Sequence, residues 1–189
     1  YPNIFLKVIG GFSGYIHERL GRGDADLACV HDLTPRRGFA VEPLIREQVF
    51  LVGAPDAVPF AREHARIEDL ATLPLILPSR ENASRRLIDR WVAQKGRMPA
   101  VKLEADNHSI IRGLVRRGVG FSLLTHGAIA DDLARGAVRA WPIRPRAYWP
   151  LALVTTTAGA RAPALDAFIH AIRTITRELA GTGAWPGRM

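Results

Sequence analysis

The sequence predicts an α/β fold in which parallel strands alternate with helices. The first observation is the order of segments in residues 4–30, where an apolar stretch, two glycines, a helical stretch and a second apolar stretch follow one another. This is the order of a βαβ unit, whose two strands run parallel. The second observation is that the same alternation continues to residue 179. The third is composition, because a chain with 48% hydrophobic residues can form a substantial core.

The first predicted elements lie before residue 31. Ile4–Ile9 is rich in strand-forming residues and is followed by a glycine pair. Ser13 can cap a short helix that continues to Leu20, and the glycine after it can end that helix. Leu27–Val30 is an uninterrupted apolar run, which is typical of a parallel strand buried on both faces.

The helix after the strand predicted at 75–77 has the clearest pattern. Asn82 or Ser84 can cap this helix, and Gly96 can end it. Its apolar residues share one helical face and are Leu87, Ile88, Trp91 and Val92. Further strands are predicted at 49–52, 101–105, 121–124, 138–143 and 149–155, and further helices at 109–117, 128–134 and 163–179. The residues after this last helix are Gly-rich and are predicted to be frayed.

The charge of the chain indicates its partners only weakly. The formal net charge is +8, and almost all of the cations are scattered arginines. We interpret this charge as favouring small anionic ligands over a DNA-binding stripe. The longest apolar runs are too short to cross a bilayer, so no membrane partner is expected. A single cysteine, Cys29, favours a reducing compartment, and a cytoplasmic location is expected.

Catalytic and metal-binding patterns are absent from the sequence. Ser13 lies in "GFSGY". A nucleophile elbow needs glycine two places before and two places after the serine, and here the later position is Tyr15. The six histidines do not have the spacing of metal ligands, and there is no nucleotide-binding Gly-Lys loop. Asp24 and Asp26 are interpreted as a turn residue and a strand-entry residue rather than a metal pair. We therefore expect no catalytic residue, no metal and no cofactor, and the protein is not expected to be an enzyme.

Two helix starts are candidates for ligand binding. The helices that begin at Ser13 and at Asn82–Ser84 follow directly after predicted strands. Unpaired backbone N–H groups and the helix dipole at such starts attract carboxylates and other anions. Ser79 and Arg80 lie just before the second helix and add a hydroxyl and a guanidinium. The alternatives remain open that Ser13 and Asn82 only cap helices and that Arg80 is a solvated surface charge.

Five stretches occur in an order and spacing that resemble one known family. They are "GRGDADLACV", "EPLIREQVFLVGAPD", "LPLILPSRENASRRLID", "EADNHSIIRGLVRRGVGFSLL" and "ARGAVRAWPI". The chain resembles the effector-binding domain of LysR-type transcriptional regulators from Tyr1 to about Leu179. The resemblance implies a type 2 periplasmic-binding-protein-like fold, with two α/β subdomains and a hinge of two crossover strands.

The resemblance also implies where the subdomains lie. Residues 1–47 and 149–189 correspond to regulatory subdomain I, and residues 48–148 correspond to regulatory subdomain II, with the hinge near 46–49 and 149–151. The family's helix-turn-helix and the first strand and helix of the effector domain have no counterpart in this chain. That first strand would lie between Ile4–Ile9 and Leu27–Val30, so subdomain I is expected to be incomplete or completed by another molecule.

The resemblance further implies a binding site between the subdomains. The effector-contacting positions of the family correspond to Ser13, His31, Ser79, Arg80, Glu81, Asn82 and His108. Ser84 is added as a donor at the helix start, and Phe121 as an apolar wall. The expected ligand is a small anionic effector such as a carboxylate.

The predicted function is that of the ligand-sensing domain of a bacterial LysR-type regulator. Effector binding would be transmitted to a DNA-binding domain outside this chain, and DNA contact is expected only through that domain. A homodimer or tetramer is expected, with the helix at 13–20 in the interface. The alternative is a free-standing solute-binding protein of a transport system, which a helix-turn-helix before residue 1 would exclude.

Overall fold

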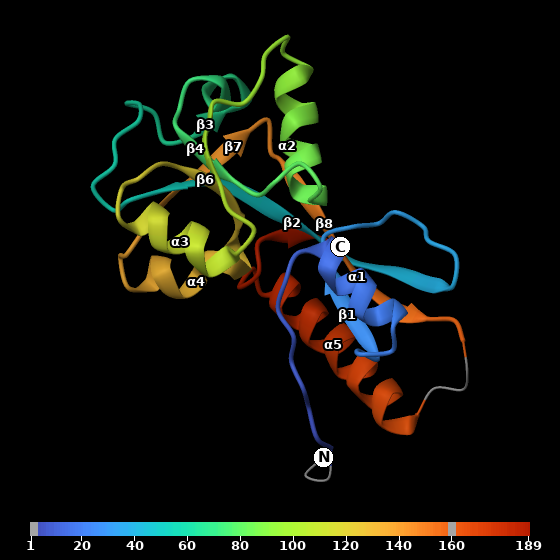
Figure 1. Cartoon of the computed structure of the whole chain (residues 1–189). Coiled ribbons are helices and arrows are strands. Elements are labelled where there is room, and N and C mark those ends of the chain that lie inside the picture. Colours follow the sequence, from blue (N-terminus) through green and yellow to red (C-terminus); the bar gives the residue numbers. More distant parts are fainter. Residues whose placement is uncertain (1–3, 159–161) are drawn as a thin grey trace. The chain divides into compact units, whose positions relative to one another are not determined.

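The computed structural model describes residues 4–158 and 162–189 (Figure 1). The chain forms two compact units. The first extends to Arg46 and resumes at Pro150, and the second covers Glu47–Trp149. Two strands pass from one unit into the other, β2 (Phe39–Gly53) and β8 (Tyr148–Thr156). The assignment of regulatory subdomains and of a hinge to these units stays a prediction.

The first unit places helices on both faces of its strands. Strand β8 pairs with β1 (Leu27–Val30) in antiparallel register, with Leu27 opposite Thr155. Successive β8 side chains point to opposite faces. Ala152 and Val154 pack with α1 (Ser13–Gly21), whereas Leu151 and Leu153 pack with α5 (Pro163–Gly181). Each face of this strand pair therefore has its own apolar cluster.

Two predictions for the first unit are wrong. Residues 4–9 form no strand, and Phe5 and Val8 are 91% and 90% exposed. A segment of strand-forming residues becomes a strand only where its backbone can pair with the free edge of another strand. Residues 4–9 make no such pairing in the part of the chain that the structure describes. Leu27–Val30 pairs with β8 rather than with a parallel neighbour. Because β1 is the last strand in the sheet order, Cys29 is exposed rather than buried.

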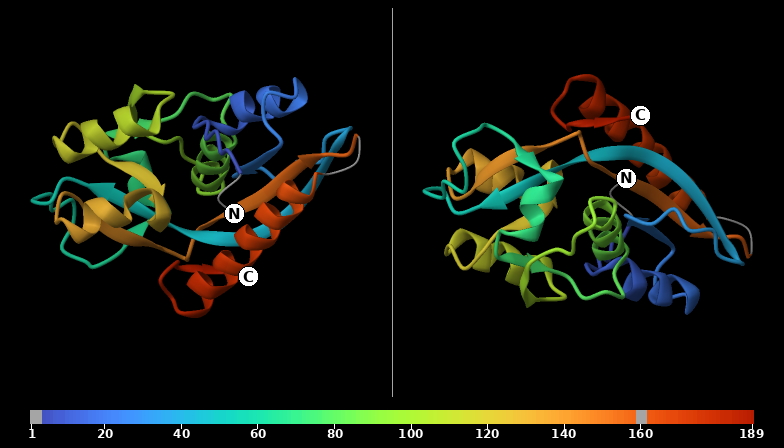
Figure 2. Two further views of the ribbon diagram at one scale, coloured as in Figure 1. Left: turned by 90° about the horizontal axis from the view of Figure 1, so that it is seen from below. Right: turned by 90° about the horizontal axis from the view of Figure 1, so that it is seen from above.

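The C-terminal tail is packed rather than frayed, which corrects a third prediction. Trp185 packs against the apolar cluster around Leu44, Leu151 and Ile169. The short strand β9 (Gly187–Arg188) pairs with β2. A Cβ atom at Gly187 would lie 2.6 Å from a side-chain atom of Ile45, so only glycine fits this close approach. Figure 2 shows this last segment beside β2 in both views.

The second unit contains the remaining elements. They are β3 (Ala65–Arg66), the 3₁₀ helix η1 (Ile67–Ala71), β4 (Leu75–Leu77), α2 (Ala83–Ala93), β5 (Val101–Glu104), α3 (His108–Arg116), β6 (Ser122–Thr125), α4 (His126–Ala134) and β7 (Arg139–Arg144). Strand β2 pairs antiparallel with β6 and β7, while β7 pairs parallel with β3. Strands β4 and β5 form a parallel pair.

Helix α2 confirms the most distinct pattern in the sequence. Ile88 and Val92 are fully buried in the main core of this unit, and Leu87 and Trp91 are partly buried at its margin. Leu75 and Leu77 of β4, whose three residues are all buried, belong to the same core cluster as Ile88 and Val92. Since β4 and β5 are parallel, their carboxyl ends lie at the same edge. The loops at 78–82 and 105–107 therefore meet beside the start of α2.

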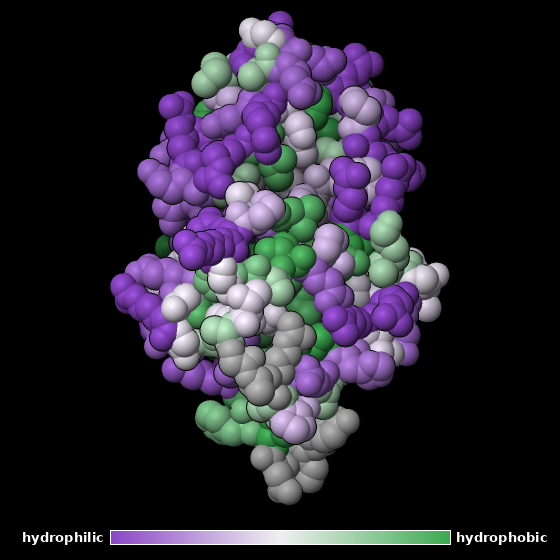
Figure 3. Space-filling view, turned by 90° about the vertical axis from the view of Figure 1, so that its right-hand side faces the viewer, coloured by the Kyte–Doolittle hydropathy of each residue, from purple (hydrophilic) through white to green (hydrophobic). Residues whose placement is uncertain are grey.

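In the described part of the chain, no helix is long and apolar enough to cross a bilayer. The face drawn in Figure 3 is mostly hydrophilic at its margins, with apolar patches between.

Candidate functional site

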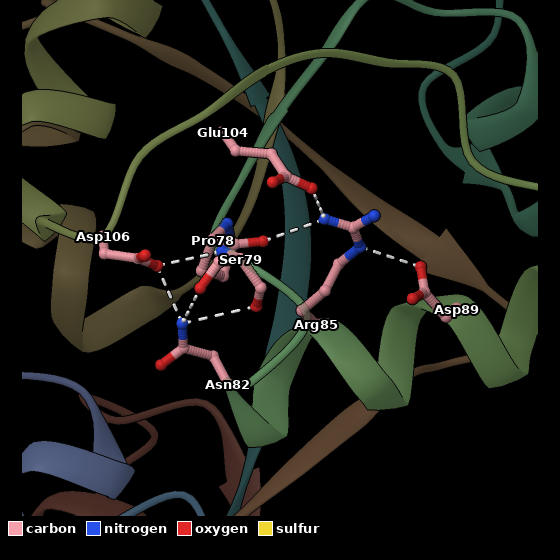
Figure 4. A network of polar contacts seen from close by, with 7 residues as sticks. All are labelled: Pro78, Ser79, Asn82, Arg85, Asp89, Glu104 and Asp106. Carbon is pink, nitrogen blue, oxygen red and sulfur yellow. Dashed lines mark hydrogen bonds and ion pairs between the residues drawn. The ribbon is translucent and has the colours of Figure 1, made fainter.

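The loop that precedes α2 is held by a carboxylate from the loop that follows β5 (Figure 4). The backbone N–H of Ser79 donates to Oδ1 of Asp106 at 2.9 Å. The side-chain amide of Asn82 donates to the same oxygen at 2.8 Å. Asp106 was not predicted as a site residue, because only the parallel pairing of β4 and β5 brings its loop to this one. It fixes the conformation of residues 79–82.

Asn82 braces the loop instead of capping the helix. It occupies the N-cap position of α2, but no side-chain cap hydrogen bond is made there. Its Nδ2 atom instead donates to the carbonyl and the hydroxyl oxygen of Ser79, at 3.3 and 3.1 Å. The expected capping role of Asn82 is therefore wrong. The first N–H groups of α2 have no cap from this residue, which leaves the positive end of the helix dipole available to an anion.

Arg85 ties the loop to the strand beneath it. Its side chain is only 2% exposed. It donates to Asp89 at 2.9 Å, to the carbonyl oxygen of Pro78 at 3.0 Å and to Glu104 at 2.6 Å. The spacing of Arg85 and Asp89 was the available sequence signal for this ion pair. Sequence reasoning missed it because neighbouring Arg86 is equally charged and is exposed.

Arg80 lies apart from the Ser79–Asn82 contacts. It is exposed and lines a cavity of about 630 Å³. Neither Ser79 nor Asn82 belongs to this lining, which otherwise consists of Glu81, Arg85, Met98, Pro99 and Val101–Glu104. The cavity thus carries both signs of charge.

The other predicted residues of the second unit have different surroundings. Ser84 is buried within α2, and His108 is the exposed first residue of α3. Phe121 contacts Trp141 edge to face, with ring centroids 6.2 Å apart, and packs against the main core. Asn107 caps α3, since its Oδ1 atom accepts the N–H groups of Ser109 and Ile110 at 2.9 and 3.1 Å. The sequence had placed the helix start near Ser109 and missed this cap.

The first unit holds the two remaining predicted residues. Ser13 is the half-buried first residue of α1, whose N-cap is Phe12 without a side-chain cap bond. The expected cap by Ser13 is therefore wrong. His31 directly follows β1 and is half-buried.

A buried histidine and aspartate lie beside these positions. The Nε2 atom of His17 is 3.7 Å from Oδ2 of Asp32, and the two residues are 4% and 6% exposed. Neither ring nitrogen of His17 has a hydrogen-bond partner in the described part of the chain. Burial and the positive charge of Arg36 lower the pKa of His17. Sequence reasoning did not single out this pair, because its members are distant in sequence.

Asp32 is ionised at neutral pH. Burial alone would raise its pKa, but the hydrogen bonds from Thr34 and the positive charge of Arg36 hold that pKa below its usual value. The backbone N–H of Thr34 donates to its Oδ1 atom at 2.9 Å. The result is a neutral imidazole next to a carboxylate.

Comparison with known proteins identifies relatives of one kind. Residues 1–177 match the family described as the LysR substrate binding domain. The HTH-type transcriptional regulator BbuR of Bordetella bronchiseptica is 29% identical over 188 residues, which cover 99% of this chain and 58% of BbuR. The uncharacterised HTH-type regulator YeiE of Escherichia coli K12 is 30% identical over 138 residues, covering 73% of this chain and 47% of YeiE. The chain thus spans about half the length of these relatives.

Solved structures confirm the predicted fold class. The effector-binding domain of QuiR, in complex with shikimate, matches with a TM-score of 0.76 and 21% identity, over 89% of this chain and 79% of that one. The regulatory domain of CcmR from Synechocystis PCC6803, in complex with 2-PG, matches with a TM-score of 0.81 and 15% identity, over 94% and 86% of the two chains.

Proposed function

Because the chain belongs to the LysR substrate binding domain family, we propose that it is the ligand-sensing part of a LysR-type transcriptional regulator. It binds a small-molecule effector, and binding shifts the protein toward one of two conformations. DNA is recognised by a segment outside this chain, and the protein works as a homodimer or tetramer in the cytoplasm. The relatives are transcriptional regulators, which supports sensing rather than catalysis and does not favour a transport role.

The observation that carries the ligand proposal is the start of α2. The side chain of Asn82 is turned away, so the first N–H groups of this helix have no side-chain cap. The loop before it is fixed by Asp106 and Arg85, so these donors are held in place before a ligand arrives. An acidic effector, such as a carboxylate, is attracted by the helix dipole and by Arg80. Ser13 and His31 stay effector contacts predicted from the family resemblance.

One feature of the site opposes an anion. The carboxylate of Asp106 already accepts the N–H of Ser79 and the amide of Asn82. These two donors are therefore occupied, and the negative charge repels an acid nearby. We accordingly assign the acid group of the effector to the first turn of α2 and to Arg80 rather than to Asn82.

A thermal-shift screen of small organic acids on this chain tests the proposal. We expect at least one acid to raise the unfolding temperature, and the Arg80→Ala variant to lose most of that rise. Arg90→Ala is a matched control, because it removes an exposed arginine near the end of the same helix. If only neutral or cationic compounds raise the unfolding temperature, the proposal that the effector is an acid is contradicted. The proposal that the chain senses a small ligand would still stand. Equal losses in both variants would contradict the role of Arg80.

A further inference from the structure

A buried carboxylate in the second unit is surrounded by three arginines. Asp132 of α4 is completely buried. The guanidinium of Arg112 on α3 contacts its Oδ2 atom twice, through Nε at 2.8 Å and through an Nη atom at 2.7 Å. This two-pronged pair joins α3 to α4 and satisfies one carboxylate oxygen.

The other two arginines are bound only loosely. Arg116 and Arg135 each place one Nη atom 3.5 Å from Oδ1 of Asp132. Their side chains are 43% and 65% exposed. Their side chains make no other hydrogen bond or ion pair with the part of the chain that the structure describes. Each guanidinium has five N–H donors, so most of the donors of both residues have no partner among the described residues.

The charge of this cluster is unbalanced. Burial alone would raise the pKa of Asp132, but the three arginines lower it, so the carboxylate is ionised at neutral pH. One negative charge then faces three positive ones. The ends of α3 and α4 favour cations through the helix dipole, and this accounts for the presence of arginines there. It does not account for two guanidinium groups that converge on one atom and leave their outer donors unused.

We propose that Arg116 and Arg135 form a contact site for the phosphate backbone of duplex DNA. Both groups approach the same oxygen atom, so they are close enough to grip one phosphate or two adjacent ones. Guanidinium groups bind phosphate oxygens through paired hydrogen bonds. Both side chains are largely exposed, so a large ligand such as duplex DNA can reach them. The net charge of +8 adds general attraction.

This contact is separate from the effector site and from sequence-specific recognition. Phosphate contacts position a protein on DNA but carry no sequence information. The sequence had led us to expect DNA contact only through another domain. The pairing of α3 with α4 changes that expectation, because it gathers arginines that are separated along the chain.

Salt-dependent binding to DNA tests the proposal on the chain as it stands. A fluorescent duplex of arbitrary sequence is titrated with the protein between 20 and 200 mM NaCl, and anisotropy gives the association constant. The double variant Arg116→Ala/Arg135→Ala should bind roughly tenfold more weakly at the lowest salt. Its slope of log K against log salt should be shallower by about 1 to 2. Arg90→Ala/Arg97→Ala is the matched control, since it removes two exposed arginines from the same unit.

Further variants and competitors distinguish a DNA contact from an acidic-protein contact and from a small-anion site. Arg116→Lys/Arg135→Lys keeps the charge and should recover most of the affinity, and circular dichroism melts confirm that each variant is folded. Equal losses in the control variant, or no binding by the unaltered chain at 20 mM NaCl, would overturn the proposal. Polyglutamate and unlabelled DNA are compared as competitors at equal charge. If polyglutamate competes as strongly as DNA, the surface would be assigned to an acidic protein instead. Strong competition by millimolar inorganic phosphate would assign it to a small ligand.

Discussion

Two buried polar clusters, one in each unit, are built in opposite ways. Arg85 in the second unit is buried and donates to a carbonyl oxygen and two carboxylates. His17 in the first unit is equally buried, yet neither ring nitrogen has a hydrogen-bond partner among the described residues. Burying a polar group costs free energy unless hydrogen bonds compensate for it. The Arg85 cluster should therefore stabilise the second unit. The His17 cluster should instead make the stability of the first unit sensitive to pH.

The largest expected effect is the removal of Arg85. Arg85→Ala should lower the free energy of unfolding by about 2–3 kcal/mol, because it leaves a buried carbonyl oxygen and two carboxylates without their donor. Asp89 and Glu104 are partly exposed, so the loss should stay below that of a fully buried pair. Urea unfolding measures it. Arg86→Ala, the exposed neighbour with the same charge, should cost less than about 0.5 kcal/mol. Similar losses in both variants would contradict the structural role of Arg85.

Replacement of His17 should have the opposite sign. Leucine has a similar volume and no polar atoms to bury, so His17→Leu should raise the free energy of unfolding by about 1 kcal/mol at pH 7. Asp32 keeps its hydrogen bond from Thr34 in this variant. Urea unfolding again gives the value. A loss of stability would show that the imidazole makes a favourable bond in solution.

The pH dependence sharpens the contrast between the two clusters. The pKa of His17 is lowered in the folded protein, so the unfolded chain takes up the proton first as pH falls. Stability should be fully present above the unfolded pKa of about 6.5 and decline as pH drops below it. Asp32, whose pKa is also lowered, adds a further loss only at more acidic pH, below about 4.

Unfolding experiments at pH 7.5 and pH 5.5 measure this decline. The His17→Leu variant should lose the part of this decline in stability that protonation of His17 causes. His170→Leu, a change at an exposed histidine of α5, should keep the pH dependence of the unaltered chain. Parallel curves for all three proteins would contradict the assignment to His17.

A smaller effect is expected at the candidate ligand site. Asp106→Asn keeps an oxygen that accepts from Ser79 and Asn82 but removes a negative charge next to α2. The affinity for an acidic effector should rise a few-fold, because repulsion between like charges is removed. Isothermal titration with an acid found in the screen measures this change. A neutral ligand of the same shape should bind equally to both proteins.

The comparison also shows what the sequence could and could not predict. The apolar face of α2 follows from local spacing, so Ile88 and Val92 were placed correctly. Whether Ile4–Ile9 forms a strand and whether Cys29 is buried depend on which strand edges are covered. That depends on contacts with residues that are distant in sequence. Asp106 reaches the loop of Ser79 only through the pairing of β4 with β5. The site residues predicted from the resemblance stay predictions, whereas the polar contacts that hold them came from tertiary structure.

The central claim is that this chain senses a small acid at the start of α2. An NMR titration of the isotopically labelled chain with an acid from the screen tests this claim most directly. The backbone amide signals of Ala83, Ser84 and Arg85 should show the largest shifts, since these N–H groups are expected to face the ligand. Those shifts should be unchanged by Arg90→Ala and reduced by Arg80→Ala. Saturable binding that leaves these three signals in place would contradict the account.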